Sequence, residues 1–212
     1  MNILDQITEK KLVPVIKLDD ADNAAPLAEA LCLGGLPVAE VTFRTLAARE
    51  SIETMCRKYP EMLVGAGTIT TVEQARQAAG AGASFLVSAG FNRKVTEYAI
   101  DNKMPIFPGV CTPTEVMYLL EYDLPVAKFF PAEQFGGLNT IKALAAPFPN
   151  MRFMPTGGIN VENILSYLAF ERIVACGGSW MVKDALITNN EFKEIERLTR
   201  EAVNLLNKEG QP

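Results

Sequence analysis

The sequence predicts an α/β fold of the TIM-barrel class, a single (β/α)8 domain. Eight short apolar runs alternate with amphipathic stretches over 212 residues, of which 49% are hydrophobic, so one large core is expected. The runs are continuously apolar, which is typical of parallel strands covered on both faces. The first run lacks the glycine-rich turn of dinucleotide-binding sheets, which favours the closed barrel over an open doubly wound sheet.

The elements can be placed in order along the chain. A helix is expected over residues 1–12, closing the bottom of the barrel, and another over 190–208, where apolar residues recur at helical spacing. Thr71 and Thr112 each open a capping box, and a proline takes the first helical position after Thr112. One domain is therefore expected over residues 1–212. The expected strands are Val13–Ile16, Val38–Phe43, Leu63–Ala66, Ser84–Val87, Pro105–Phe107, Val126–Phe130, Met151–Met154 and Ile173–Cys176.

Charge and composition argue against several kinds of partner and of catalytic site. The chain carries 20 Lys+Arg against 25 Asp+Glu, scattered without a basic stripe, so neither nucleic acid nor a membrane surface is an expected partner. It lacks a leader of basic then apolar residues, and its four cysteines are widely spaced, so a cytoplasmic location with reduced thiols is expected. With no histidine, the chain can have no histidine base and no histidine-based metal site.

Lys128 is the first candidate catalytic residue, because it lies inside the apolar run Val126–Phe130. A lysine is almost never fully buried unless it is paired, and burial favours its neutral amine, which is the form that attacks a carbonyl. Glu40, Thr42 and Arg44 alternate along the second strand and should face the barrel interior together. A catalytic couple of Lys128 and Glu40 is expected. The structural alternatives are that Lys128 reaches the solvent, or that Glu40 merely neutralises Arg44 or Lys128.

Glycines mark a second candidate site, at the ends of the last two strands. Gly157-Gly158 follows the seventh strand, and Gly177-Gly178-Ser179 follows the eighth. Barrels often bind phosphate at this place through bare backbone N–H groups. A phosphate site is therefore expected there, although a pair of glycines can also serve only to make a tight turn.

Six segments together resemble the 2-dehydro-3-deoxy-phosphogluconate (KDPG) and 4-hydroxy-2-oxoglutarate (KHG) aldolases. The resemblance implies a class I aldolase, a homotrimer of (β/α)8 subunits, without a metal ion or other cofactor. It implies that Lys128 forms a Schiff base, that Glu40 is the acid and base, and that Arg44 and Thr68 bind the substrate carboxylate. Gly158, Gly178 and Ser179 would contact phosphate. The segments are Val13–Ile16, Glu40–Thr45, Gly65–Thr68, Lys128–Glu133, Pro155–Ile159 and Gly177–Trp180.

The resemblance also implies a reaction of carbohydrate metabolism in the Entner–Doudoroff pathway. The 2-oxo acid substrate would be cleaved to pyruvate and glyceraldehyde 3-phosphate, and 4-hydroxy-2-oxoglutarate to pyruvate and glyoxylate. Phe130 is expected to form an apolar wall beside the amine, and Thr156 to line the hydroxylated middle of the substrate. The alternatives are a preference for the galactonate-derived epimer, a sugar-phosphate isomerase or epimerase of the same fold, and a non-catalytic barrel that binds a sugar phosphate.

Overall fold

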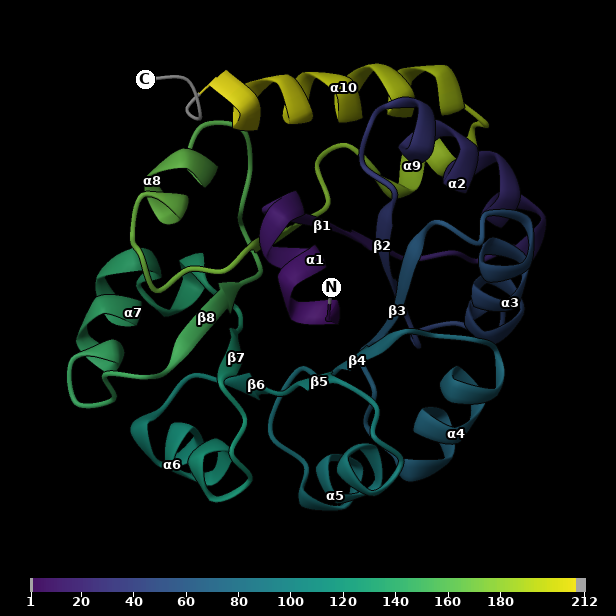
Figure 1. Cartoon of the computed structure of the whole chain (residues 1–212). Helices are drawn as coiled ribbons and strands as arrows, with labels where there is room; N and C mark the ends of the chain where they lie inside the picture. The colour runs from purple at the N-terminus through teal and green to yellow at the C-terminus, as the bar shows by residue number, and fades with distance from the viewer. Residues whose placement is uncertain (1, 209–212) are drawn as a thin grey trace.

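The computed structural model describes residues 2–208. The parallel strands curl around a central axis, and most of the helices lie outside them (Figure 1). The predicted α/β class is confirmed, and its parallel strands form curled sheets. Met1 and residues 209–212, the ends of the predicted domain, lie outside the described residues.

Nine short strands, all paired in parallel, form two sheets within residues 2–208. The larger has the order β5-β4-β3-β2-β1-β9, and the smaller has the order β6-β7-β8. Isolated parallel bridges join Phe153 to Ile173 and Thr156 to Gly177, so the free edge of β8 lies beside β9. The strands are β1 Leu12–Ile16, β2 Val38–Thr42, β3 Leu63–Gly67, β4 Phe85–Val87, β5 Ile106–Phe107, β6 Gly109–Val110, β7 Val126–Phe129, β8 Arg152–Pro155 and β9 Cys176–Gly178.

The fifth and the eighth predicted strands differ most from the observed ones. The predicted fifth strand continues as β6 after a break at Pro108, which has no N–H to donate. The carbonyl of Pro108 still accepts a hydrogen bond from Lys128 N–H at 2.9 Å. The predicted eighth strand, Ile173–Cys176, lies too early in the chain, because Cys176, Gly177 and Gly178 are the residues that pair with β1.

In the described part of the chain, ten α-helices and two 3-10 turns connect and cover the strands. The long helix α10 crosses one side of the molecule next to α2 (Figure 1). The helices are α1 Ile3–Lys10, α2 Ala24–Leu33, α3 Ala48–Lys58, α4 Val72–Gly80, α5 Arg93–Asp101, α6 Pro113–Glu121, α7 Gly137–Ala145, α8 Ile164–Leu168, α9 Asp184–Thr188 and α10 Phe192–Lys208, with the turns η1 Ala21–Asn23 and η2 Glu133–Phe135.

The two predicted capping boxes differ in the structure. At α6, Thr112 and Glu115 make the reciprocal bonds of a capping box, as predicted. At α4, Thr71 accepts from Gln74 N–H, but the Gln74 side chain bonds Thr70 instead of Thr71, so this box is not formed as predicted. Burial raises the pKa of Glu115, but hydrogen bonds from Cys111 N–H and from the Thr112 hydroxyl and N–H outweigh it and leave the pKa below its usual value.

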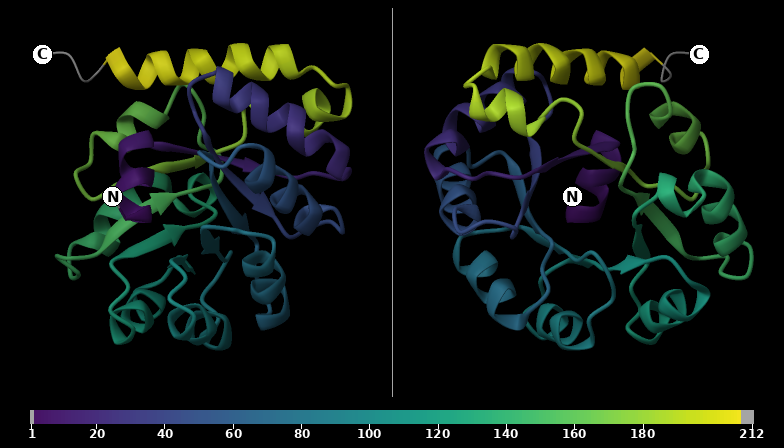
Figure 2. Two further views of the ribbon diagram at one scale, coloured as in Figure 1. Left: turned by 45° about the vertical axis from the view of Figure 1, so that its right-hand side comes forward. Right: turned by 180° about the vertical axis from the view of Figure 1, so that it is seen from behind.

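Helix α1 covers the end of the barrel-like sheet at which the strands begin. Asn2 caps the helix by accepting from Asp5 N–H at 2.9 Å, and Ile7 is completely buried. Lys11, with a left-handed φ of 61°, turns the chain directly into β1. Figure 1 shows α1 in front of the centre of the ring, and the view from behind in Figure 2 shows it through the strands. The opposite end, where the strands finish, is left for a site.

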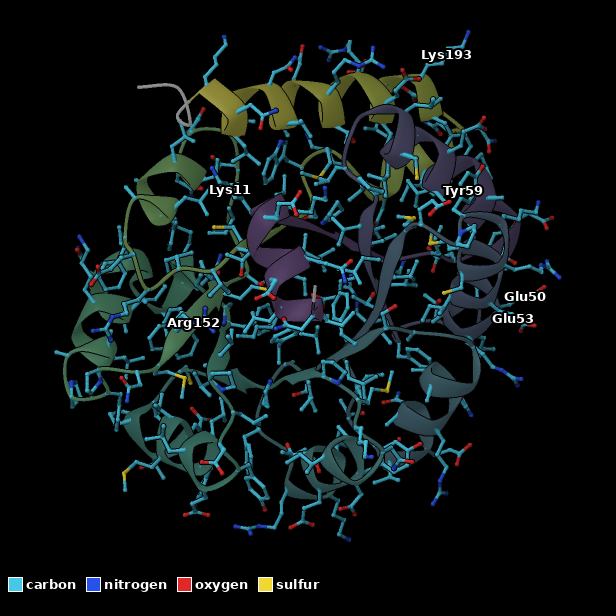
Figure 3. All side chains as sticks on the ribbon, viewed as in Figure 1. Lys11, Glu50, Glu53, Tyr59, Arg152 and Lys193 are labelled. Atoms are coloured by element: carbon cyan, nitrogen blue, oxygen red, sulfur yellow. The ribbon has the colours of Figure 1, made fainter. Side chains whose placement is uncertain are left out.

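Charged side chains gather on the outside of the helices. Glu50 and Glu53 on α3 and Lys193 on α10 are exposed and point away from the ring (Figure 3). No helix among residues 2–208 combines the length and the apolar character needed to cross a membrane.

Candidate active site

Lys128 and Glu40 are the only charged residues that are buried in the described part of the chain. Lys128 on β7 is 5% exposed, and Glu40 on β2 is 1% exposed. Lys128 Nζ donates a hydrogen bond to Glu40 Oε1 at 3.0 Å, and it lies 5.5 Å from the centre of the Phe130 ring. Strands from different sheets therefore bring together the amine and the acid that the sequence predicts. Lys128 does not reach the solvent.

A glycine makes room for the acid. A Cβ atom on Gly67, at the end of β3, would lie 2.2 Å from Glu40 Oε1 and 2.7 Å from its Cγ. Glu40 on β2 lies opposite Gly65 on β3. Both Gly65 and Gly67 are glycines, so neither of them places a side chain against Glu40. The second carboxylate oxygen, Oε2, is buried and has no hydrogen-bond partner among the described residues. Such an oxygen is free to accept from a water or a substrate hydroxyl.

Arg44 does not pair with Glu40, so that structural alternative is wrong. The sequence places Arg44 at the end of a long second strand, but β2 ends at Thr42 and Arg44 lies in the following turn. Its Nε donates to Thr42 Oγ1 at 3.0 Å, and Thr42 Oγ1 donates to the carbonyl of Ile16 at 2.8 Å. Thr42 is 2% exposed and thus links the guanidinium to β1. The sequence reasoning missed this role of Thr42, because it depends on a neighbouring strand.

A cavity of about 300 Å³ opens where the strands end. It brings together seven of the ten predicted site residues: Arg44, Phe130, Thr156, Gly157, Gly158, Gly178 and Ser179. Its other lining residues are Val15, Ile159, Gly177 and Asp184. Asp184 was not predicted, and it lies 3.8 Å from the ammonium of Lys17. A larger groove of about 900 Å³ lies between α2 and α10, but none of the predicted residues lines it.

Thr156 contributes a hydroxyl that is ready to bind a ligand. It is 5% exposed and lines the cavity, and its Oγ1 has no partner within residues 2–208. A Cβ atom on Gly177 would lie 2.3 Å from this oxygen, so the glycine gives the hydroxyl its space. Thr68 is half-buried and follows β3 with a left-handed φ of 57°, and it is not among the residues that line this cavity.

Cys111 is a half-buried free cysteine and does not line the cavity. Burial raises the pKa of its thiol, and the nearby Glu115 carboxylate raises it further. A raised pKa leaves less of the thiol in its reactive thiolate form.

Comparison with known proteins gives one consistent match. Residues 3–198 match the family of aldolases described as KDPG and KHG aldolase. The 2-dehydro-3-deoxy-phosphogluconate aldolase of Haemophilus influenzae is 46% identical to the chain over 204 residues, which cover 96% of each protein.

Solved structures agree. The KDPG aldolase of Legionella pneumophila, with pyruvate captured at low pH as a covalent carbinolamine intermediate, is 36% identical with a TM-score of 0.90, over 93% of this chain and 97% of that one. The 2-keto-3-deoxy-6-phosphogluconate aldolase of Zymomonas mobilis ZM4, with 3-phosphoglycerate, is 38% identical with a TM-score of 0.82, over 92% of this chain and 96% of that one.

Proposed function

The chain belongs to the KDPG and KHG aldolase family, and we propose that it cleaves 2-dehydro-3-deoxy-6-phosphogluconate to pyruvate and glyceraldehyde 3-phosphate through a Schiff base on Lys128. The observation that carries the proposal is the buried contact of Lys128 Nζ with Glu40 Oε1 at 3.0 Å. An amine held next to one acid, away from bulk water, is suited to attack a carbonyl and to exchange protons.

The reaction follows from this pair. Glu40 takes a proton from the Lys128 ammonium, and the neutral amine attacks the C2 carbonyl of the substrate to form a carbinolamine. Loss of water, with Glu40 moving the protons, gives an iminium ion. Glu40 then removes the proton of the C4 hydroxyl and the C3–C4 bond breaks, with its electrons passing into the iminium. Protonation of the resulting enamine and hydrolysis release pyruvate and restore the amine. The Legionella pneumophila relative holds pyruvate as a carbinolamine, which supports the first step.

The other site residues bind the two ends of the substrate. Arg44 offers a fork of N–H donors to the carboxylate, with help from the Thr68 hydroxyl. Phe130 keeps the amine poorly solvated, and Thr156 faces the hydroxylated middle of the substrate. The phosphate contacts are assigned to Gly157, Gly158, Gly178 and Ser179, which line the same cavity. The Zymomonas mobilis relative was solved with 3-phosphoglycerate, a phosphorylated acid of this kind.

Five further features belong to the proposal. The whole chain forms one domain, in which β5 and β6 act as one strand broken at Pro108 and the bridges beside β8 and β9 close an eight-stranded barrel. The enzyme works as a homotrimer, in the cytoplasm, and needs no cofactor, because the iminium itself accepts the electrons. It also cleaves 4-hydroxy-2-oxoglutarate to pyruvate and glyoxylate.

Borohydride trapping tests the proposal directly. Incubation with pyruvate and borohydride should add the reduced pyruvate adduct to Lys128, located by mass spectrometry of the digested protein. Lys128→Met should abolish both the adduct and turnover, while Glu40→Gln should slow turnover and leave slow adduct formation. A protein that carries no adduct on Lys128 contradicts the proposal and favours an isomerase, an epimerase or a binding protein.

A further inference from the structure

In the turn that carries Gly157 and Gly158, three successive carbonyl groups accept hydrogen bonds from other segments of the chain. The carbonyl of Thr156 accepts from Ala132 N–H at 2.8 Å, and that of Gly157 accepts from Glu133 N–H at 3.1 Å. The carbonyl of Gly158 accepts from Asn163 Nδ2 at 3.0 Å. The three donors lie directly before η2, at the first residue of η2 and directly before α8.

These bonds decide where the N–H groups of the turn point. In a trans peptide, the N–H is directed opposite to the carbonyl that precedes it. The N–H groups of Gly158 and Ile159 therefore point away from Glu133 and Asn163. Neither N–H donates to another residue in the described part of the chain, and both residues line the cavity. Two neighbouring free N–H groups form an anion-binding concavity.

Asn163 is the residue that fixes the far side of this turn. Its Nδ2 donates to the Gly158 carbonyl, and its Oδ1 accepts from Asn160 N–H at 2.9 Å. Asn160 Nδ2 also reaches the Gly158 carbonyl, at a longer 3.3 Å. One amide side chain thus closes the loop from Gly158 to Asn163 with a donor and an acceptor at once.

Glu133 and Tyr167 support the near side. A Cβ atom on Gly158 would lie 2.5 Å from Glu133 Cγ, so the stem of Glu133 lies directly against this glycine. The hydroxyl of Tyr167, on α8, donates to Glu133 Oε1. Tyr167 is 2% exposed, and burial followed by the bond to Glu133 raises the pKa of its phenol well above the usual range, so the donor keeps its proton.

We propose that Asn163 and the Tyr167–Glu133 pair are positioning residues, which hold the Gly157–Gly158 turn with its free N–H groups toward the phosphate of the substrate. This inference rests on the proposed function for the identity of the anion. It makes these residues determinants of specificity for phosphorylated over unphosphorylated 2-oxo acids, although none of them touches the reacting atoms.

The test compares two substrates in two variants, Asn163→Ala and Tyr167→Phe. Each should raise KM for the phosphorylated substrate, and the inhibition constant of inorganic phosphate, by about three- to tenfold, as expected for the loss of one hydrogen bond that supports the turn. KM for 4-hydroxy-2-oxoglutarate, kcat for both substrates and the pyruvate–borohydride adduct should not change. Tyr122→Phe is the matched control, because Tyr122 donates to Glu97 at 2.9 Å on the exposed surface of α5 and α6 and should leave every value unchanged.

Each outcome decides between the two proposals. An equal rise in KM for both substrates, or no change for either, overturns the positioning role while the adduct on Lys128 leaves the aldolase proposal intact. If the wild-type protein forms no adduct, the aldolase proposal fails, and calorimetric titration with inorganic phosphate then decides on the turn. Weaker phosphate binding by Asn163→Ala and Tyr167→Phe than by wild type supports the inference in that case, and equal binding overturns it.

Discussion

Replacing Lys128 by methionine should make the stability of the protein strongly dependent on pH. The substitution keeps the volume of the side chain but leaves Glu40, which is 1% exposed, without its cation. Its Oε2 already lacks a partner among the described residues, so no other group there compensates a charge. Removing one partner of a buried ion pair costs about 3–5 kcal/mol when the other stays charged. Glu40 will therefore take up a proton in the folded variant.

The sign of the pH effect follows from this proton. Above about pH 4.5 an unfolded chain releases the proton of a glutamate, whereas the folded Lys128→Met variant retains the proton on Glu40. The folded state then binds more protons, and the free energy of unfolding falls by about 1.4 kcal/mol for each pH unit. The free energy of unfolding of Lys128→Met should be close to that of the double variant Lys128→Met/Glu40→Gln at about pH 4.5. At pH 7 it should be lower by about 3 kcal/mol.

Urea unfolding of the two variants at one protein concentration, at pH 5, 6 and 7, measures this difference. The double variant is the control, because it has no titrating group at this position and shares the same methionine. Parallel curves for the single and double variants would refute the reasoning, since they would mean that water or a rearranged side chain solvates Glu40 in the absence of Lys128.

Three other predictions follow from the same geometry. Gly67→Ala should lower kcat about 100-fold, because the new Cβ forces the Glu40 carboxylate to move by an ångström or more, and circular dichroism should show an unchanged fold. Thr42→Val should release Arg44 and thereby raise KM for the 2-oxo acid about tenfold, with little change in kcat. Thr42→Ser keeps the hydroxyl and should have the wild-type KM. A Thr42→Val enzyme with normal KM contradicts the role of Thr42 in holding Arg44. Because the lowered pKa of Glu115 adds stability that is lost as the pH falls, wild type should lose more stability than Glu115→Gln between about pH 5 and pH 3 in urea unfolding, and equal losses would contradict this.

The buried contact of Lys128 with Glu40 could be predicted from the sequence because its signals are local. Lys128 stands out within an apolar run, and Glu40 follows the alternation of a strand that has no other acid. The alternation does not extend to Arg44, because β2 ends at Thr42 and Arg44 lies in the turn that follows. The guanidinium still reaches the cavity, but through its bond to Thr42, which depends on the position of β1.

What escaped prediction depends on contacts between distant segments. The last predicted strand begins at Ile173 because an apolar run begins there, whereas two of the three residues that pair with β1 are glycines, which have low strand propensity. Gly67 acts through the side chain that it lacks, and its importance is visible only once Glu40 lies beside it. Asn163 and Tyr167 act on the Gly157–Gly158 turn through hydrogen bonds that no spacing rule contains.

The position of helix α1 has a consequence for the order in which products depart. With α1 packed across one end of the sheet and Ile7 completely buried there, the cavity at the strand ends is the route that the structure offers to the substrate and to both fragments. In the proposed mechanism pyruvate stays covalently tethered until hydrolysis, so the phosphorylated aldehyde has to leave first. In the synthetic direction the same arrangement requires pyruvate to enter before the aldehyde.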